Sequence, residues 1–374
     1  MSDAARVLER CAELGRISEE GGRLTRRFGT EAMRRANALV GGWMQEAGLT
    51  VREDEVGNLI GRRGEGRPFV LGSHLDTVRN AGRYDGPLGV VVALAVLERG
   101  FPRVPVEVVG FADEEGVRFG TAYLGSAAMT GRFDPSWLAR VDEDGVALAD
   151  LVARPPAAPA EPPLGYVEVH IEQGPELERL GEPLGVVTAI AGQSHAAVTF
   201  VGEAGHAGTV PMGARRDALA GAAEWMLEVE RAGPVATVGE LRVDPGVRNV
   251  IPGQVTMTLD LRDPSDDVRR AAVAELSSRA EDIAARRRLG LRWEDRADMP
   301  AIPMDERLTA LLGDDLPHLV SGAGHDAGMM ASVAPAAMLF VRCRGGISHH
   351  PDESVEEADV AAALDALERF LRAL

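Results

Sequence analysis

The stretch GPLGVVVALAVLERG, residues 86–100, most constrains how this chain can fold. It has helical length, and nearly every residue in it is apolar, so no side of the helix suits water. Such a helix has to be buried between other elements. The strand-like runs on either side of it, RPFVLGSH and PVEVVGFADEEG, indicate that the surrounding layers include a β-sheet. The sequence therefore predicts an α/β fold.

Other segments extend the same α/β pattern. Helical apolar spacing marks residues 3–16 and 31–47, and the sequence ends in an amphipathic helix, SVEEADVAAALDALERFLRAL. The run GYVEVHIEQGPELERLG at 165–181 predicts a strand, a turn and a helix that begins near Pro175. A proline-rich connection, ARPPAAPAEPPLG at 153–165, is expected on the surface.

From about residue 190 the pattern changes to strand, helix, strand, strand, helix, strand. That order is ferredoxin-like and predicts an antiparallel sheet with two helices on one face. We therefore expect an inserted domain at residues 190–299, within a larger α/β domain formed by residues 1–189 and 300–374. Pro264 and Ser265 are expected at the start of the second helix of the insert.

Charge and cysteine content exclude several classes of protein. The formal net charge of −18 disfavours nucleic acid or an anionic membrane as the main partner. Two cysteines, Cys11 and Cys343, are too few for a disulfide framework and suit a reducing cytosol. Residues 1–20 are charged and helical in pattern, unlike a signal peptide, and no apolar run approaches the roughly 20 residues of a membrane span. The expected location is the cytoplasm.

Three histidines close apolar runs in the company of carboxylates: His74 in GSHLD, His170 in VEVHIEQG and His349 in GGISHHPDE. Strand ends are where an open α/β sheet presents its site. A strand-end histidine alone is more often structural, and an acidic pair such as Glu114–Glu115 is usually solvated surface. The joint occurrence of these groups at strand ends favours a metal site, and imidazole with carboxylate suits zinc.

A centre of two metals that share one carboxylate would need about five or six side-chain ligands. The chain offers five without forcing any other residue into the set: His74, Asp85, Glu115, His170 and His349. Because these residues lie far apart along the chain, their convergence is a prediction about the folded protein.

Over nearly its whole length the sequence resembles the M20-type metal-dependent amidohydrolases, in the branch that contains N-carbamoyl-L-amino acid hydrolases and allantoate amidohydrolases. The resemblance is carried by GSHLDTV, GRYDGPLGV, DEEGVRFG, HIEQGPELE, GEAGHAGTVPM, RNVIPGQV, SGAGHDAGMMA and GISHHPDE. HIEQGP is especially informative, because in this branch it supplies a histidine where the related peptidases use an acid. The implied fold is a metallopeptidase-like α/β catalytic domain with an inserted ferredoxin-like lid and dimerisation domain.

The resemblance implies two divalent metal ions per subunit, zinc or manganese, with cobalt and nickel also suited to these ligands. Asp85 would bridge the metals, and the terminal ligands would be His74, Glu115, His170 and His349. Glu114 would be the general base, which takes a proton from the attacking water and passes it to the leaving nitrogen. Asp76 would accept the second ring N–H of His74 and so fix its tautomer.

The resemblance also implies roles for residues of the insert. His206 would stabilise the oxyanion of the tetrahedral intermediate in the active site of the partner subunit, which implies a homodimer through the inserted domain. Substrate would be held by Gln193, Asn249 and Arg262, the last as a clamp on a carboxylate. Taken alone, Arg262 predicts only a surface strand arginine. His195 stands near a position where the family often has an arginine, so its substrate contacts are left open.

Several alternatives stay open. The leading function is hydrolysis of the C–N bond of an N-carbamoyl (ureido) carboxylate, which yields the amine, carbon dioxide and ammonia. Allantoate is an alternative substrate, and an aminoacylase or dipeptidase of the wider family would use the same carboxylate clamp. A catalytically silent binding protein would be expected to lose ligands or the base, whereas the sequence has all of them. His350 is the alternative to His349 as a ligand.

Overall fold

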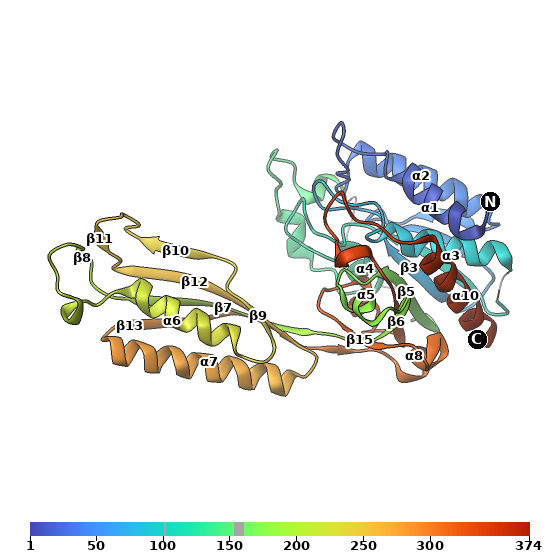
Figure 1. The fold of residues 1–374 in the computed structure, drawn as a ribbon. Helices are drawn as coiled ribbons and strands as arrows, with labels where there is room; N and C mark the ends of the chain where they lie inside the picture. Colours follow the sequence, from blue (N-terminus) through green and yellow to red (C-terminus); the bar gives the residue numbers. More distant parts are fainter. Residues whose placement is uncertain (101, 153–160) are drawn as a thin grey trace. The chain divides into compact units, whose positions relative to one another are not determined.

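The protein is described by a computed structural model that divides into two compact units and covers residues 1–100, 102–152 and 161–374. Unit 1 consists of Met1–Thr188 and Met304–Leu374, and unit 2 consists of Ala189–Pro303 (Figure 1). The boundaries expected from the sequence were residues 190 and 299. Residues 153–160 of the expected proline-rich connection lie outside the described residues.

The larger sheet has a parallel central part that lies in unit 1. Its strand order over the described residues is β1-β2-β4-β3-β5-β16-β6-β14, with β15 paired to β6. The strands are β1 (Thr50–Glu53), β2 (Leu59–Arg63), β3 (Phe69–His74), β4 (Val106–Phe111), β5 (Gly165–Ile171), β6 (Leu184–Ile190), β14 (Ile302–Pro303), β15 (His318–Ser321) and β16 (Ala336–Val341). β3 pairs in parallel with β4 and β5, and β16 pairs in parallel with β5. The carboxyl ends of these four buried strands therefore meet at one edge of the sheet.

The helices of unit 1 cover this sheet. They include α1 (Asp3–Leu14), α2 (Glu31–Glu46), α3 (Pro87–Arg99), α4 (Leu124–Met129), α5 (Glu176–Leu180), α8 (Glu306–Gly313), α9 (Asp326–Met330) and α10 (Glu357–Ala373). α3 is the apolar helix expected at residues 86–100. Residues 87–97 of this helix are all buried, which confirms the prediction. α3 packs on β3, β4 and β5 and also contacts α1 and α10.

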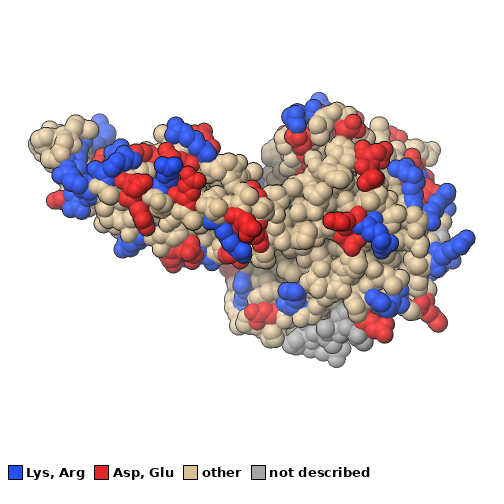
Figure 2. Space-filling view, turned by 90° about the horizontal axis from the view of Figure 1, so that it is seen from below, with Lys and Arg blue, Asp and Glu red and all other residues tan. Residues whose placement is uncertain are grey.

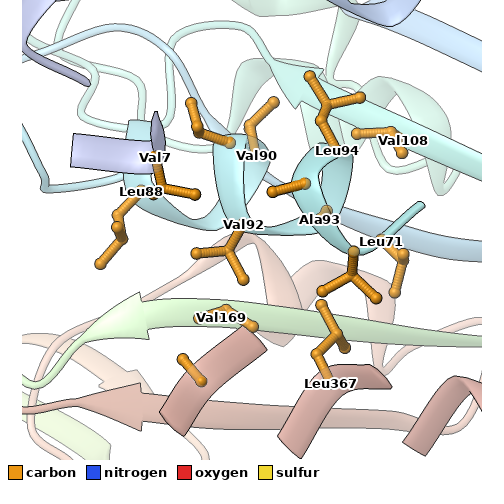
Figure 3. Close-up of a cluster of buried hydrophobic side chains, with 14 of the residues drawn as sticks. Val7, Leu71, Leu88, Val90, Val92, Ala93, Leu94, Val108, Val169 and Leu367 are labelled. Atoms are coloured by element: carbon orange, nitrogen blue, oxygen red, sulfur yellow. The ribbon is translucent and has the colours of Figure 1, made fainter. Parts of the chain in front are cut away.

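The core around α3 is made of small aliphatic side chains. Figure 3 shows Val90, Val92 and Leu94 of α3 among side chains from the sheet and from α1 and α10. Each fully buried side chain of this size contributes about 1.5–3 kcal/mol relative to its exposed state. A Cβ on Gly89 would lie 2.1 Å from the carbonyl oxygen of Val169, so a glycine is needed for α3 to approach β5 this closely.

Unit 2 has the ferredoxin-like order that the sequence predicts. Its antiparallel sheet has the order β10-β12-β7-β13, with β9 also paired to β12. The strands are β7 (Gly192–Val201), β9 (Val235–Thr237), β10 (Leu241–Asp244), β12 (Gln254–Asp263) and β13 (Gly290–Met299). The helices α6 (Ala218–Glu230) and α7 (Asp266–Arg287) pack together on one face of this sheet (Figure 1). The expected start of α7 is confirmed, because Ser265 caps it by accepting the N–H of Val268.

One predicted strand of the insert is interrupted. The sequence VATVGELRVD predicted a single strand, but the structure has two shorter strands, β9 and β10, one after the other along the same edge of β12. The hydroxyl of Thr258 accepts the N–H of Glu240, so this donor bonds a side chain where a continuous strand would use a backbone carbonyl. A separate short pair, β8 (Gly205–His206) and β11 (Val250–Ile251), lies beyond the starting end of β12.

One face of the molecule carries acidic and basic side chains among one another. In Figure 2, acidic and basic side chains are intermixed on this face, with uncharged residues between them. Within residues 1–100, 102–152 and 161–374, no helix has the length and apolar character needed to cross a membrane.

Candidate metal centre

Four chain segments bring the predicted ligands to the carboxyl edge of the parallel strands. His74 is the last residue of β3, and His170 lies one residue before the end of β5. Glu115 follows β4 in the acidic turn, and Asp85 lies just before α3. His349 follows β16 in the loop that leads to α10. The convergence that the sequence could only predict is present in the folded chain.

The carboxylate of Asp85 lies at the centre of this group. Its Oδ1 is 3.4 Å from Nε2 of His74 and 3.3 Å from Nε2 of His170. Its Oδ2 is 3.4 Å from Nε2 of His349. Gln173 donates a hydrogen bond to the same Oδ2 at 2.8 Å. One buried carboxylate thus faces two imidazoles with one oxygen and a third imidazole with the other.

The donor atoms form two groups of three that share Asp85. One group is His74, Asp85 and His170, the other is Asp85, Glu115 and His349, and in each the donor atoms lie within 4.8 Å of one another. Nitrogen and carboxylate oxygen are the donors that zinc, manganese, cobalt and nickel accept. Nε2 of His170 is buried without a hydrogen-bond partner among the described residues. These residues therefore fit a pair of divalent cations bridged by one carboxylate.

The pKa shifts of His74 and Asp85 are also those expected of a site for divalent cations. Burial opposes protonation of His74, but the carboxylates of Asp85, Glu114 and Asp76 outweigh burial and hold the pKa of His74 well above its usual value. Burial also opposes ionisation of Asp85, yet the imidazoles of His170 and His74 hold its pKa well below the usual value. In the absence of cations, protons on the histidines therefore balance the carboxylates, and a divalent cation would take over that role.

Both buried histidines direct Nε2 toward Asp85 because their Nδ1 atoms are engaged elsewhere. Nδ1 of His74 lies 3.0 Å from the backbone oxygen of Asp76, and Nδ1 of His170 lies 2.9 Å from the backbone oxygen of Ile171. The sequence-based expectation was that the carboxylate of Asp76 would accept the N–H of His74. That carboxylate is farther away, at 3.7 Å, so the nearer acceptor is the carbonyl of the same residue.

The carboxylate of Asp76 instead holds the acidic turn. It accepts the backbone N–H of Glu114 at 3.1 Å and that of Glu115 at 3.2 Å. Glu114 is buried, and burial raises its pKa well above the usual value. Glu115 directs Oε1 to within 3.4 Å of Nε2 of His349. Neighbouring glutamates thus have different surroundings, as their different predicted roles require.

The two adjacent histidines of GISHHPDE are clearly distinguished. His349 directs Nε2 toward Asp85 and Glu115. His350 is more exposed and has its nearest carboxylate in Asp352, where Nδ1 and Oδ2 are 3.6 Å apart. Of the two, His349 is the residue in contact with the other donors.

Sequence reasoning missed several residues that hold this group together. Glu353 accepts the backbone N–H groups of Tyr84 at 2.6 Å and Asp85 at 3.1 Å, so it joins the loop of His349 to the loop of Asp85. Ser348 donates its hydroxyl to Asp85. These residues lie inside motifs that the sequence analysis quoted, beside the chosen ligands. Burial with the nearby charge of Asp85 raises the pKa of Glu353 to about 7.

The four predicted substrate contacts of unit 2 form two pairs. Gln193 on β7 lies opposite Arg262 on β12, and His206 on β8 lies near Asn249, whose backbone oxygen accepts the N–H of Ala207. The first pair lies where β7 starts, and the second lies beyond the other end of β7. Eight residues of strand between Gln193 and the end of β7 span roughly 25 Å.

Arg262 is bound to a carboxylate of its own unit. Its Nε and Nη2 donate to Asp260 at 2.9 and 2.7 Å, which is a bidentate pair. Nε2 of His195 lies 3.6 Å from the same carboxylate. His206 is exposed, and its Nδ1 accepts the N–H of Gly208 at 3.0 Å.

Comparison with known proteins places these features in context. Residues 70–373 match peptidase family M20/M25/M40. An allantoate deiminase of Arabidopsis thaliana is 40% identical, and the match covers 98% of this chain and 81% of the relative. An N-carbamoyl-L-amino acid amidohydrolase of Geobacillus stearothermophilus is also 40% identical, with 98% and 97% covered. A hydantoinase/carbamoylase family amidase of Burkholderia multivorans has a similar structure, with a TM-score of 0.93, 34% identity, and 99% and 97% covered.

Proposed function

This chain belongs to peptidase family M20/M25/M40, and we propose that it is an amidohydrolase that uses two divalent cations per subunit. The proposed reaction is hydrolysis of the C–N bond of an N-carbamoyl (ureido) carboxylate, such as an N-carbamoyl-L-amino acid. The observation that carries the proposal is the carboxylate of Asp85, which the two donor groups share.

One cation would be held by His74, Asp85 and His170, and the other by Asp85, Glu115 and His349. Zinc is the proposed metal, and manganese, cobalt or nickel suit the same donors. When bound, such cations act as Lewis acids toward the scissile carbonyl and make water a better nucleophile at neutral pH. The chain's own contribution is to hold five donors in place and to keep Nε2 of each buried histidine available.

Glu114 is the proposed general base. Asp76 anchors its backbone N–H, and its side chain lies in a group with His74 and Glu115 whose donor atoms are within 4.8 Å of one another. From there the carboxylate would take a proton from the attacking water and deliver it to the leaving nitrogen. Since the ureido carbonyl is stabilised by resonance, a base placed beside the nucleophile lowers a high barrier.

Unit 2 would supply the contacts to the substrate and to its oxyanion. Gln193 and Arg262 would hold the substrate carboxylate, while His206 and Asn249 lie beyond the far end of β7. A small substrate cannot span the roughly 25 Å of strand between the two pairs. We therefore propose that His206 of one subunit serves the site of its partner, in a homodimer that forms through unit 2.

Two ureido substrates have similar support. The relatives named allantoate deiminase and N-carbamoyl-L-amino acid amidohydrolase have the same identity to this chain. Both names describe substrates that carry a ureido group and a carboxylate, so the same cations and clamp would serve either. An aminoacylase or dipeptidase activity is the third candidate, and His170, in place of the acid that the related peptidases use, favours the ureido branch.

A substrate panel with defined metal content tests the proposal. The protein is stripped with a chelator, reloaded with zinc or manganese, and assayed on N-carbamoyl, N-acetyl and dipeptide forms of one amino acid and on allantoate. The proposal predicts turnover of an N-carbamoyl amino acid or allantoate by the reloaded protein only. Turnover limited to the N-acetyl or dipeptide form would overturn the substrate assignment, and full activity of the stripped protein would overturn the metal dependence.

We also place the protein in the cytoplasm. Cys11 and Cys343 are both buried free thiols. Burial raises the pKa of Cys11 to about 12 and that of Cys343 to about 11, so neither is a reactive thiolate at neutral pH. Unpaired thiols of this kind suit a reducing compartment. Cell fractionation would check the assignment.

A further inference from the structure

Glu168 is a fully buried carboxylate that neither the proposed ligand set nor the proposed chemistry uses. It lies on β5, two residues before His170, and its side chain has no exposure to solvent. Burial of a carboxylate is unfavourable unless donors compensate for the lost water, so its presence calls for partners. It has three hydrogen-bond donors, each from a different place in the chain.

The three donors come from β3, from β5 and from α9. Oε1 accepts the hydroxyl of Ser73 at 2.9 Å. Oε2 accepts the backbone N–H of Ala327 at 2.9 Å and lies 3.1 Å from the hydroxyl of Tyr166, which shares its single proton between Glu168 and the backbone oxygen of Gly72 at 3.0 Å. Glu168 thereby ties together two strands of the sheet and the first turn of a short helix.

Two of these contacts lead directly to the histidines of one donor group. Ser73 immediately precedes His74 on β3. The segment of Ala327 also carries His325, whose ring packs edge-on against the ring of His170, with centroids 4.6 Å apart and planes at 65°. His325 is in turn within 2.8 Å of the hydroxyl of Ser321 through Nε2. Glu168 therefore holds the backbone next to His74, and it holds the segment of His325, whose ring packs against His170.

A role for Glu168 as a ligand itself is less consistent with these contacts. Donor atoms of Glu168, His170 and His325 lie within 4.8 Å of one another, which is close enough for a cation. The two oxygens of Glu168 already accept three protein donors, and a carboxylate offers about four lone-pair sites. Nδ1 of His170 is also engaged by the backbone oxygen of Ile171, and its Nε2 faces Asp85.

We propose that Glu168 is a positioning residue that fixes His74 and His170 for the cation they share with Asp85. The second donor group, formed by Asp85, Glu115 and His349, is built from other loops. Loss of Glu168 should therefore weaken one cation site and spare the other. This inference rests on the proposed centre of two cations.

Metal titration of Glu168→Gln tests the selectivity. An amide at this position puts an N–H group where the carboxylate accepts hydrogen bonds. Zinc affinity of the two sites is measured by competition with a chromophoric chelator, and cobalt-loaded protein is compared by its visible absorption spectrum. We expect two zinc sites in the unsubstituted protein, and in the variant one site weakened about 10–100-fold with the other unchanged. The cobalt spectrum should change accordingly.

Glu107→Gln is the matched control. Glu107 is a buried carboxylate on β4, which β3 separates from β5 in the same sheet, and it pairs with Arg62 at 2.7 Å, so the substitution also removes a buried charge from the sheet. It should leave both zinc affinities and the cobalt spectrum unchanged. Equal loss at both sites in Glu168→Gln, or the same effect from Glu107→Gln, would assign Glu168 a general structural role and overturn the inference.

Ser73→Ala keeps the test decisive if Glu168→Gln does not fold. It removes one donor to Glu168 and should weaken the same site in the same sense, by a smaller factor. Wild-type affinity at both sites in Ser73→Ala would contradict the inference. The proposed function fails separately, if the unsubstituted protein binds no divalent cation at all.

Discussion

Nε2 of His349 lies 3.4 Å from Oδ2 of Asp85, and the same nitrogen lies 3.4 Å from Glu115. In the absence of cations, the carboxylate of Glu115 raises the pKa of His349, burial opposes it, and Asp85 adds to the increase, so that the pKa is about 8. Protonated His349 cannot bind a cation. If His349 is a metal ligand as proposed, this contact makes the metal affinity of its site depend on pH.

We predict that zinc affinity rises with pH up to about 8. Below that pH, His349 must release a proton before it can bind, so its site loses about tenfold in affinity for each pH unit. Competition titrations from pH 6 to pH 9, with proton release measured by calorimetry in two buffers, would check this. An affinity that stays constant between pH 6 and pH 8 would contradict it. His350→Gln is the control and should keep the same profile.

Glu114→Gln should abolish most turnover while metal content stays the same. The amide cannot take a proton from water, and general base catalysis typically contributes about 10²–10⁴-fold. Turnover on the best substrate of the panel is measured together with bound zinc by elemental analysis. Near wild-type turnover would show that another group is the base. Glu65→Gln, an exposed glutamate, serves as the control.

Arg262→Gln should raise KM for carboxylate substrates more than it lowers kcat. A hydrogen bond to a charged group contributes about 1.5–3 kcal/mol, which corresponds to roughly 10–100-fold in KM. The bidentate pair with Asp260 must rearrange if Arg262 is to bind substrate through the same edge. Arg279→Gln, on α7 of the same unit, should leave KM unchanged. An unchanged KM in Arg262→Gln would remove this residue from the substrate site.

Mixed dimers can test whether His206 acts on the partner's site. His206→Ala and Glu114→Gln should each be nearly inactive alone. Subunit exchange between them creates a heterodimer in which one site has an intact Glu114 and an intact His206 from the other subunit. An equal mixture should then recover about a quarter of wild-type activity. No recovery after verified exchange, or a fully active monomer, would contradict action across subunits.

Arg26→Met should destabilise unit 1. Arg26 has no exposure and donates to the backbone oxygens of Leu75 at 2.8 Å, Leu14 at 2.9 Å and Ile17 at 3.1 Å. Burial lowers its pKa to about 10, so it stays charged at neutral pH. Without the guanidinium these buried carbonyl oxygens lose their donor, which costs about 1–3 kcal/mol for each group left unsatisfied. Urea unfolding followed by circular dichroism would show an earlier transition, whereas exposed Arg35→Met should not differ from wild type.

The helices and strands that the sequence predicts well are those with strong apolar patterns. The buried helix at 86–100 and the runs that become β3, β4 and β5 are visible in the sequence because nearly every residue in them is buried. The split between β9 and β10 is not visible in this way, since it depends on a hydroxyl of Thr258 on a neighbouring strand. Periodicity describes one segment at a time and does not report such cross-strand contacts.

The predicted site residues were identified by residue type and by family resemblance. The residues that hold them in place could be identified only from the folded structure. Arg262 was expected to bind substrate, but its carboxylate partner Asp260 lies two residues away on the same strand face, a spacing that the sequence contains. Glu168 has the same relation to His170. In a β-strand, residues two apart lie on the same face, so the sequence already predicts that Asp260 lies beside Arg262 and Glu168 beside His170. The hydrogen bonds of Glu168 with Ser73 and Ala327 join segments that are distant in the sequence, and no local pattern predicts them.

The position of β16 has a consequence for how the protein is made. β5 and β6 are neighbours along the chain, yet in the sheet β16 is inserted between them, and β16 is synthesised only after all of unit 2. While the ribosome is still producing residues 189–303, the larger sheet therefore lacks the strand that separates β5 from β6, and His349 has not yet been made. Unit 2 has its own core and can fold in the meantime. The nascent chain acquires the full set of proposed cation donors only after the segment that carries His349 has left the ribosome.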